Sequence, residues 1–305
     1  MAINGKRALI TGIQGFTGHY MAAELSAAGY RVFGLGSQPS NEPDYFQVDL
    51  LDAKGLTYII EQVRPHLVVH LAAIAFVGHG DPGAFYDVNV VGTRNLLVAL
   101  SRVADTIDAV LLASSANVYG NTQAGMLSET AVVNPANDYA VSKLAMEYMA
   151  KLWSEKLPII IVRPFNYTGV GQSDNFLLPK IVSHFKRKAD EIELGNLDVW
   201  RDFTDVRALV KAYLGLLIAK PIGEIINVCS GRTYSLREVI SLCEKITSHS
   251  LSIHVNPAFV RANEVKTLCG DARKLQSIVN GWNTPPLEQT LLWMLEKNDE
   301  SGFFY

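Results

Sequence analysis

The chain has 305 residues, of which 49% are hydrophobic and 19% are charged, and its formal net charge is -3. Such values are typical of a globular protein with one large core or two lobes, and they give no electrostatic case for nucleic acid binding. The longest apolar stretch, residues 67–77, is far shorter than the roughly 20 residues that span a bilayer, so we expect no membrane association. The cysteines lack CxxC spacing and the histidines lack ligand spacing, so we expect no metal site and a cytoplasmic location.

The first half of the chain alternates short apolar runs with longer helical patterns. Continuous apolar runs such as "AVLLA" and "IIIV" indicate strands covered on both faces, as in a parallel sheet. This alternation predicts a doubly wound α/β domain. We expect strands at 7–11, 31–35, 45–48, 67–71, 109–113 and 158–162, and helices at 16–28, 53–64, 84–103 and 136–156.

The stretch "ALITGIQGFTGHY" places three glycines where the first strand turns into the first helix. Gly12, Gly15 and Gly18 would let a diphosphate approach the backbone, and the helix N-terminus behind them favours negative charge. A plain tight turn would show the same spacing. The stretch therefore favours dinucleotide binding without establishing it.

The stretch "NPANDYAVSKLAMEYM" carries a candidate proton donor. Tyr139 and Lys143 are four residues apart on an expected helix and share one face. We expect the lysine ammonium to lower the pKa of the phenol towards neutrality. Ser115 follows an expected strand, where its hydroxyl could bind a substrate carbonyl. The alternatives are a surface Tyr–Lys pair and a serine that merely ends a strand.

The pattern changes after Arg163. "RPFNYTGVGQSDNF" is rich in Gly, Asn and Pro and is expected to form a substrate loop at the end of a strand. A helix at 206–219, a strand at 224–228 and a helix at 235–247 follow, with short elements to about 296. We expect a dinucleotide-binding domain at 1–164, with 203–230 returning to it, and a smaller lobe at 165–202 and 231–305.

Taken together, these motifs resemble the extended short-chain dehydrogenase/reductase family, over essentially the whole chain. Further matches are "VDLLD", "HLAA" and "NVVGTRNLL". The resemblance implies a Rossmann fold in which Tyr139 exchanges a proton, Ser115 orients the carbonyl and Lys143 holds the nicotinamide ribose. It also implies cofactor contacts at Gly12, Gln14, Gly15, Phe16, Thr17, Gly18, Ser37, Asp49, Leu50, Leu71, Ala72, Ala73, Asn89, Tyr139, Lys143 and Pro164.

Two positions after the catalytic serine distinguish between reactions within this family. The 4,6-dehydratases resemble one another in carrying acidic side chains there, whereas this chain has Ala116 and Asn117. The difference favours reduction or epimerisation over dehydration.

The second half contains "RPFNYTGVGQSDNF", "GNLDVWRDFTDVRALVKAY", "INVCSGRTYSLREVI" and "VRANEVKTLCGDARKLQSIVNGW". These segments resemble GDP-4-keto-6-deoxy-D-mannose reductases and the related GDP-mannose dehydratases. Without the resemblance, Arg201 would be read as a partner of Asp198 or Asp202, and Arg261 as a partner of Glu264. The resemblance implies substrate contacts at Ser115, Asn117, Asn166, Asn175, Lys180, Arg201, Arg261 and Glu264.

The end of the second expected strand, "VFGLGSQPS", bears on the choice of cofactor. It lacks the acidic residue that would bind the ribose hydroxyls of NAD, and Ser37 could bind a 2′-phosphate. No arginine follows immediately, which weakens the case for a 2′-phosphate. We expect NADPH as the cofactor, with NADH tolerated.

The sequence therefore predicts a reductase that converts GDP-4-keto-6-deoxy-D-mannose to GDP-D-rhamnose. Open alternatives are formation of the 6-deoxytalose epimer, a dTDP-linked substrate, a nucleotide-sugar epimerase and a non-catalytic NADP-binding protein. We also expect a homodimer through helices 84–103 and 136–156, on the apolar spacing of Ala140, Leu144, Ala145 and Tyr148.

Overall fold

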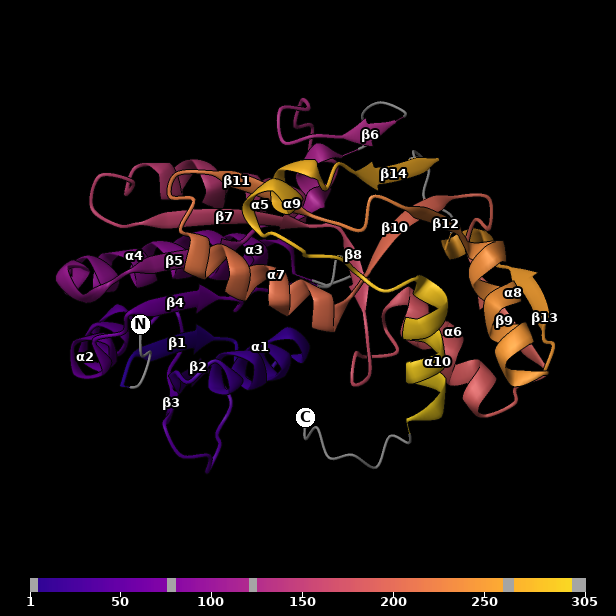
Figure 1. Ribbon diagram of the computed structural model, residues 1–305, viewed down its shortest axis with the longest axis horizontal. Helices are drawn as coiled ribbons and strands as arrows, with labels where there is room; N and C mark the ends of the chain where they lie inside the picture. Colours follow the sequence, from indigo (N-terminus) through magenta and orange to yellow (C-terminus); the bar gives the residue numbers. More distant parts are fainter. Residues whose placement is uncertain (1–4, 76–80, 121–124, 260–265, 298–305) are drawn as a thin grey trace.

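A parallel sheet forms the larger part of the molecule in this computed structural model, which describes residues 5–75, 81–120, 125–259 and 266–297. Within these ranges, seven strands pair in the order β11-β7-β5-β4-β1-β2-β3, all parallel (Figure 1). The doubly wound α/β fold expected from the sequence is confirmed. The strands are β1 (Arg7–Thr11), β2 (Arg31–Gly36), β3 (Tyr45–Gln47), β4 (Leu67–His70), β5 (Ala109–Ala113), β7 (Ile159–Pro164) and β11 (Ile225–Val228).

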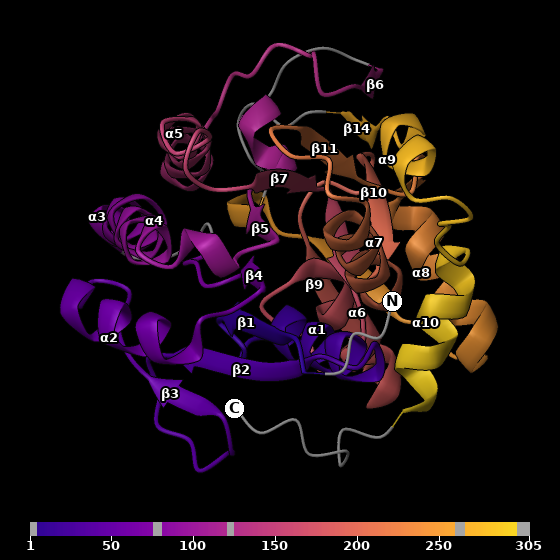
Figure 2. The ribbon, with the colours of Figure 1, turned by 60° about the vertical axis from the view of Figure 1, so that its left-hand side comes forward.

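Helices cover both faces of this sheet, and each face has its own apolar core (Figure 2). One face carries α1 (Phe16–Ala27), α7 (Val206–Ala219) and α9 (Arg273–Ile278). The other carries α2 (Ala53–Val63), α4 (Thr93–Ser101) and α5 (Asp138–Lys151). Strands buried on both faces are continuously apolar because each side chain meets one of these two cores.

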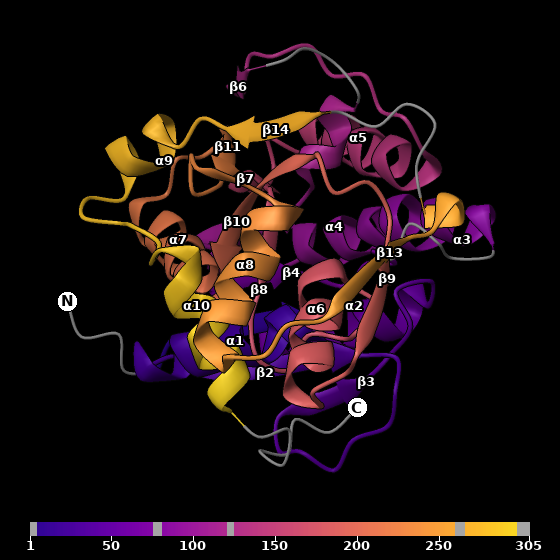
Figure 3. The same cartoon turned by 90° about the vertical axis from the view of Figure 1, so that its right-hand side faces the viewer.

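A second lobe lies beside the sheet, with a third apolar core of its own (Figure 3). Its described strands pair in the order β12-β10-β14-β6, β8 pairs with β10, and β9 pairs with β13. The strands are β6 (Met126–Leu127), β8 (Asn166–Thr168), β9 (Glu191–Leu194), β10 (Trp200–Asp205), β12 (Thr233–Ser235), β13 (Ser252–Val255) and β14 (Thr267–Gly270). The helices are α6 (Leu177–Lys186), α8 (Leu236–Thr247) and α10 (Leu287–Glu296), and a short 3-10 turn, η4 (Pro257–Phe259), follows β13.

The two lobes exchange segments of chain. β11 belongs to the first sheet, and α7 packs on its core. β6, however, pairs with β14 in the second sheet although it lies within residues 1–164. α9 and Trp282 pack on the first core although they lie within 231–305. Both arrangements depend on contacts between residues far apart in the sequence, and such contacts leave no local sequence pattern.

Polar side chains set where several helices begin. Asp52 and Asn137 accept hydrogen bonds from Gly55 and Ala140 at the starts of α2 and α5. Ser235 and Glu238 form a reciprocal capping box at the start of α8.

The helix expected at 84–103 is instead divided in three. Its parts are α3 (Pro82–Tyr86), the π-helical segment η1 (Asp87–Gly92) and α4, and the 3-10 turn η2 (Ala104–Thr106) follows them.

Since all seven strands are parallel, the segments that follow them meet at one edge of the sheet. The chain leaves β1 and β4, which are neighbours, towards opposite faces, and this creates the position where such sheets bind ligands. In the described part of the chain, no helix is long and apolar enough to cross a bilayer. No group of three or more His, Cys, Asp or Glu side chains there is placed to hold a metal.

Candidate active site

Residues 12–15, here called the glycine loop, connect β1 to α1 at this edge. Gly12 has a φ of +71°, and a Cβ there would lie 2.8 Å from the backbone nitrogen of Ala72. A Cβ on Gly18 would lie 2.3 Å from the carbonyl oxygen of Gly12, so only glycine lets the helix pack so closely. Gly15 is the N-cap residue of α1, which therefore begins without a side-chain cap. Its first amide groups therefore remain available to an anion.

The loop after β4 lies against the glycine loop. The backbone nitrogens at positions 71 and 72 donate to the carbonyl and hydroxyl oxygens of Thr11, at 3.1 and 3.2 Å. Asn89, fully buried in η1, accepts from the Ile74 nitrogen at 3.1 Å and donates to Ser142 Oγ at 3.0 Å. Asn89 thus shapes the loop and joins it to α5.

His70 joins three elements beneath this loop. Its Nδ1 lies 2.7 Å from Thr11 Oγ1 and its Nε2 lies 2.8 Å from Thr93 Oγ1. Burial lowers the pKa of His70 to about 3, and the nearby Lys143 charge acts in the same direction. The imidazole is therefore neutral at physiological pH and links β1, β4 and α4.

The loop after β2, residues 37–44, contains acidic but no basic side chains. Its first residue, Ser37, is exposed directly after β2. The Tyr45 hydroxyl donates to the Gln38 carbonyl oxygen and, at 2.9 Å, to Gln14 Oε1. Neutral groups therefore hold this loop against the glycine loop.

Asp49 and Leu50 follow β3 at the same edge. Asp49 is exposed and accepts from the Leu51 nitrogen at 2.8 Å, whereas Leu50 is buried. Asn95 donates to the Leu50 carbonyl oxygen at 3.0 Å, which fixes the turn to α4.

Ser115, Tyr139 and Lys143 come together at the end of β5. Ser115 Oγ accepts from the Asn117 nitrogen at 3.1 Å, at the start of the 3-10 turn η3 (Ala116–Tyr119). Tyr139 lies on the buried face of α5, near enough to Ser115 for that side chain to affect its pKa. One helical turn later, Lys143 Nζ donates to the Ala113 carbonyl oxygen at 2.8 Å.

The pKa of Tyr139 is raised, not lowered as expected. Burial raises it to about 12, and Ser115 opposes this shift. Burial also lowers the pKa of Lys143 to about 8, with Glu147 opposing. The Tyr139 phenol therefore carries its proton at neutral pH, and Lys143 is mostly charged. The site is set up to donate a proton.

A buried polar network behind the site was missed by sequence reasoning. Arg163 on β7 pairs with Glu147 on α5 through two contacts of 2.6 and 2.9 Å. Ser114 donates to Glu147 at 2.5 Å, and Arg163 donates to the Tyr119 hydroxyl at 3.1 Å. Tyr119 in turn donates to Asn227 on β11 at 2.7 Å. The network ties the helix that carries Tyr139 to β7, to β11 and to the residue that follows β5.

Three of the expected substrate contacts lie on neighbouring segments at the strand ends. Asn117 is exposed just after Ser115. Asn166 begins β8, is exposed, and donates to the Asp202 carbonyl oxygen at 3.2 Å. Arg201 lies on the paired strand β10 and donates to the Trp200 carbonyl oxygen at 3.0 Å.

The carboxylates named as alternative partners of Arg201 have other partners. Asp198 pairs with Arg237 at 2.9 Å. Asp202 is fully buried and accepts from the backbone of Gly231 at 2.9 Å and of Ser230 at 2.8 Å. Burial raises the pKa of Asp202, and these hydrogen bonds oppose the shift.

The other expected substrate contacts are further out in the second lobe. Asn175 is exposed just before α6. Lys180 Nζ donates to the Glu193 carbonyl oxygen at 2.8 Å and lies 4.8 Å from the centre of the Phe259 ring. Arg261 and Glu264 lie outside the described residues.

Comparisons with known proteins agree with this geometry. Residues 9–286 match the family described as GDP-mannose 4,6 dehydratase. The GDP-6-deoxy-D-talose 4-dehydrogenase of Aggregatibacter actinomycetemcomitans is 35% identical over 274 residues, covering 89% of this chain and 90% of the relative. The GDP-6-deoxy-D-mannose reductase of Pseudomonas aeruginosa is 34% identical over 288 residues, covering 91% of each.

Solved structures show the same relationship. RMD from Pseudomonas aeruginosa, complexed with NADPH, matches with a TM-score of 0.83 and 32% identity over 95% of this chain and 97% of that one. A protein from Burkholderia cenocepacia J2315, whose assignment as an epimerase is provisional, matches with a TM-score of 0.91 and 52% identity over 97% and 98%. The chain therefore belongs to the GDP-mannose 4,6-dehydratase family of short-chain dehydrogenases and reductases, and it is an oxidoreductase.

Proposed function

We propose that the chain uses NADPH to reduce C4 of a GDP-linked 4-keto-6-deoxyhexose, converting GDP-4-keto-6-deoxy-D-mannose to GDP-D-rhamnose. The observation that carries the proposal is the buried Tyr139 phenol, which keeps its proton at neutral pH and lies on one face of α5 with Lys143. Two relatives at 34 and 35% identity, both named for oxidoreductases of GDP-6-deoxyhexoses, support the class of substrate.

The residues of the site divide the reaction between them. NADPH, when bound, supplies the hydride. Ser115 donates a hydrogen bond to the keto oxygen and polarises it, and Tyr139 gives its phenolic proton to that oxygen as negative charge develops. Lys143 binds the ribose hydroxyls next to the nicotinamide. Its positive charge also stabilises the Tyr139 oxygen after the proton has left.

The described residues fit a dinucleotide phosphate, with a preference for NADPH. The glycine loop brings backbone close to the ligand position, and α1 begins without a side-chain cap. The loop after β2 carries no carboxylate at residues 36–38, where one would bind ribose hydroxyls and repel a 2′-phosphate. In the proposal, Ser37 donates a hydrogen bond to that phosphate, and NADH, which lacks the phosphate, binds more weakly.

The residues after Ser115 support simple reduction. Ala116 is buried and Asn117 is exposed, and neither side chain can exchange a proton at neutral pH. Elimination of water from the sugar would lack its acid and its base. A dehydratase activity is therefore not part of the proposal.

Formation of GDP-6-deoxy-D-talose is the second candidate. It is favoured by the relative from Aggregatibacter actinomycetemcomitans, which is as similar to this chain as the mannose-type reductase is. The two products differ only in the face of C4 that receives the hydride. The second lobe sets that face, because it orients the sugar.

The test is NADPH oxidation by the purified protein with GDP-4-keto-6-deoxy-D-mannose, followed by NMR of the sugar product. We expect turnover and the rhamnose configuration at C4. A 6-deoxytalose product would support the proposed reductase activity and contradict the proposed configuration at C4. Turnover of a dTDP-linked ketosugar alone would make the nucleotide wrong, and NADPH binding without any turnover would favour an epimerase or a non-catalytic protein.

We also infer that the protein is a homodimer through η1, α4 and α5. η1, α5 and the residue that follows α5 carry exposed apolar side chains, namely Val91, Val141, Tyr148 and Leu152. Among the residues expected at the interface, Ala140 is buried within the protomer, Leu144 and Ala145 are half-buried, and Tyr148 is 59% exposed. A cytoplasmic location fits the three cysteines, which are all free and buried.

A further inference from the structure

Tyr167 lies on β8, but its side chain contacts the first turn of α1. Its ring stacks on Phe16 with the centroids 6.1 Å apart and the planes 9° from parallel. Its hydroxyl forms a hydrogen bond of 2.9 Å with Thr17 Oγ1. Phe16 and Thr17 directly follow the glycine loop, so Tyr167 contacts the helix end at which the dinucleotide phosphate would bind.

The backbone of Tyr167 belongs to the second lobe. β8 pairs with β10, with Tyr167 opposite Thr204, and the preceding residue, Asn166, is a proposed substrate contact. Gln172 donates to the Tyr167 carbonyl oxygen at 3.2 Å. The main chain of Tyr167 therefore lies in the lobe proposed to bind the nucleotide sugar. Its side chain lies at the end of α1 proposed to bind the dinucleotide.

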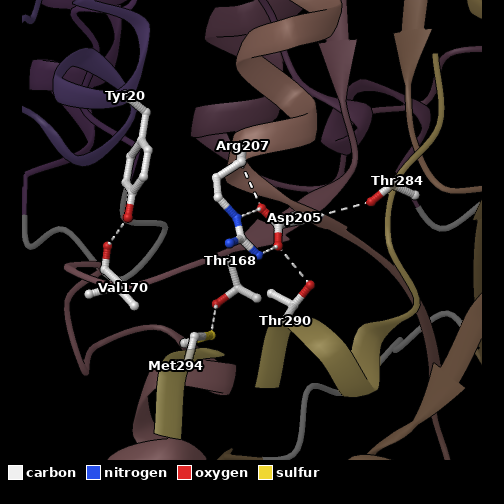
Figure 4. Close-up of polar contacts among 8 residues, drawn as sticks. All are labelled: Tyr20, Thr168, Val170, Asp205, Arg207, Thr284, Thr290 and Met294. Atoms are coloured by element: carbon white, nitrogen blue, oxygen red, sulfur yellow. Dashed lines mark hydrogen bonds and ion pairs between the residues drawn. The ribbon is translucent and has the colours of Figure 1, made fainter. Parts of the chain in front are cut away.

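A second link further along α1 strengthens the first. Tyr20 donates to the Val170 carbonyl oxygen at 2.7 Å, as Figure 4 shows, and its ring meets the edge of Trp293 on α10. A Cβ on Gly169 would lie 3.1 Å from the Trp293 ring and 3.4 Å from the Phe16 ring. Residues 167–170 therefore lie closely along α1, and neither can shift without breaking these contacts.

We infer that Tyr167 is a positioning residue that couples binding of the dinucleotide at the glycine loop to binding of the nucleotide sugar in the second lobe. The inference rests on the proposed function. Each ligand needs a defined arrangement of α1 relative to residues 167–170. Binding of the first ligand orders this arrangement at the expense of part of its binding free energy. The second ligand then meets an ordered site and binds more tightly.

The experiment compares the Kd for NADPH with and without saturating GDP. In the wild-type protein we expect GDP to lower this Kd by about fivefold or more. Tyr167→Phe keeps the stacked ring and loses the bond to Thr17, so the ratio should fall below about twofold. Tyr58→Phe, on the exposed face of α2, should keep the wild-type ratio. Because coupling is reciprocal, NADPH must change the Kd for GDP by the same ratio in each protein.

A second variant separates coupling from a general loss of structure. Thr17→Val removes the same hydrogen bond from the other side, so it should reduce the ratio as Tyr167→Phe does, and the double variant should reduce it no further. An unchanged ratio in Tyr167→Phe, or losses that add in the double variant, would overturn the inference. Independent binding in the wild type would overturn it and leave the proposed function in place. Failure of the wild type to bind NADPH or GDP would overturn both.

Discussion

Tyr139 and Lys143 share one buried face of α5, and burial shifts their pKa values in opposite directions. Burial disfavours the charged form of each group, which is the phenolate of Tyr139 and the ammonium of Lys143. The phenol therefore keeps its proton at neutral pH, while the lysine titrates only about one unit above it. A phenol that is protonated at neutral pH can donate its proton to a keto oxygen.

Replacing Tyr139 with Phe removes the proton and keeps the ring. We expect kcat for ketosugar reduction to fall by about 10²–10⁴-fold, the usual contribution of a general acid. Tyr148→Phe, at an exposed position on the same helix, is the control and should keep the wild-type kcat. Near wild-type turnover of Tyr139→Phe would show that the proton comes from another group.

Lys143 predicts the pH dependence of cofactor binding. Its pKa in the ligand-free protein is about 8, so the ammonium is lost as pH rises through that value. We expect the Kd for NADPH to rise above pH 8 by up to about tenfold per pH unit, measured by NADPH fluorescence. Lys143→Met should bind more weakly at neutral pH and lack this dependence. A wild-type Kd that stays constant to about pH 9.5 would contradict the role given to the ammonium.

At the scale of elements, α5 is held to β7 by the buried pair of Glu147 and Arg163, which are 2% and 4% exposed. Glu147→Gln leaves the Arg163 charge buried without its counter-charge, so we expect the free energy of unfolding to fall by about 3–5 kcal/mol. Urea titration measures this loss. The double variant Glu147→Leu with Arg163→Met should recover most of it, because no unpaired charge remains. A double variant no more stable than Glu147→Gln would contradict this account.

His70 connects β1, β4 and α4 as a neutral side chain. Its folded pKa of about 3 lies below the ordinary value of 6.5, so it costs no stability above pH 6.5. As pH falls from 6.5 towards 3, the unfolded chain binds a proton that the folded protein excludes, and stability is lost. The stability difference between the wild type and His70→Gln should fall by about 2 kcal/mol from pH 7 to about pH 5. A difference independent of pH would show that His70 accepts a proton in the folded protein.

The helices and strands that were predicted well are marked by patterns within their own residues or at their ends. β1 and β5 are apolar runs buried on both faces, and α2 and α8 have capping side chains at their starts. α6 and α10 were not predicted as helices, and both begin without a side-chain cap. The break at 87–92 depends on Asn89, whose partners lie on other segments. Contacts of that kind leave no periodic pattern in the sequence.

The candidate site likewise contains features with a local sequence signal and features that depend on long-range contacts. The glycine loop and the spacing of Tyr139 and Lys143 are local, and the structure brings them together with Ser115. The direction of the pKa shift of Tyr139 was not predictable, because it depends on burial by the rest of the fold. The pair of Glu147 and Arg163 had one available signal, since each is a charge within an otherwise apolar pattern.

At the scale of the whole molecule, the exposed apolar side chains around α5 predict the oligomeric state. Tyr148→Glu combined with Leu152→Glu places two charges in the proposed contact, so we expect light scattering to show half the wild-type mass. Tyr58→Glu on α2 should leave the mass unchanged. A wild-type protein that already scatters as a monomer would contradict the dimer.

The pairing of β6 with β14 has a consequence for how such a protein can diversify. Residues 126–127 complete the sheet of the second lobe from within the first half of the chain, and α9 completes the first core from within the second half. No contiguous fragment therefore contains a whole lobe. A gene fusion or a recombination event could not exchange the sugar-binding part as a module. New specificity must instead arise by substitutions and loop changes in a fold that is inherited as one piece.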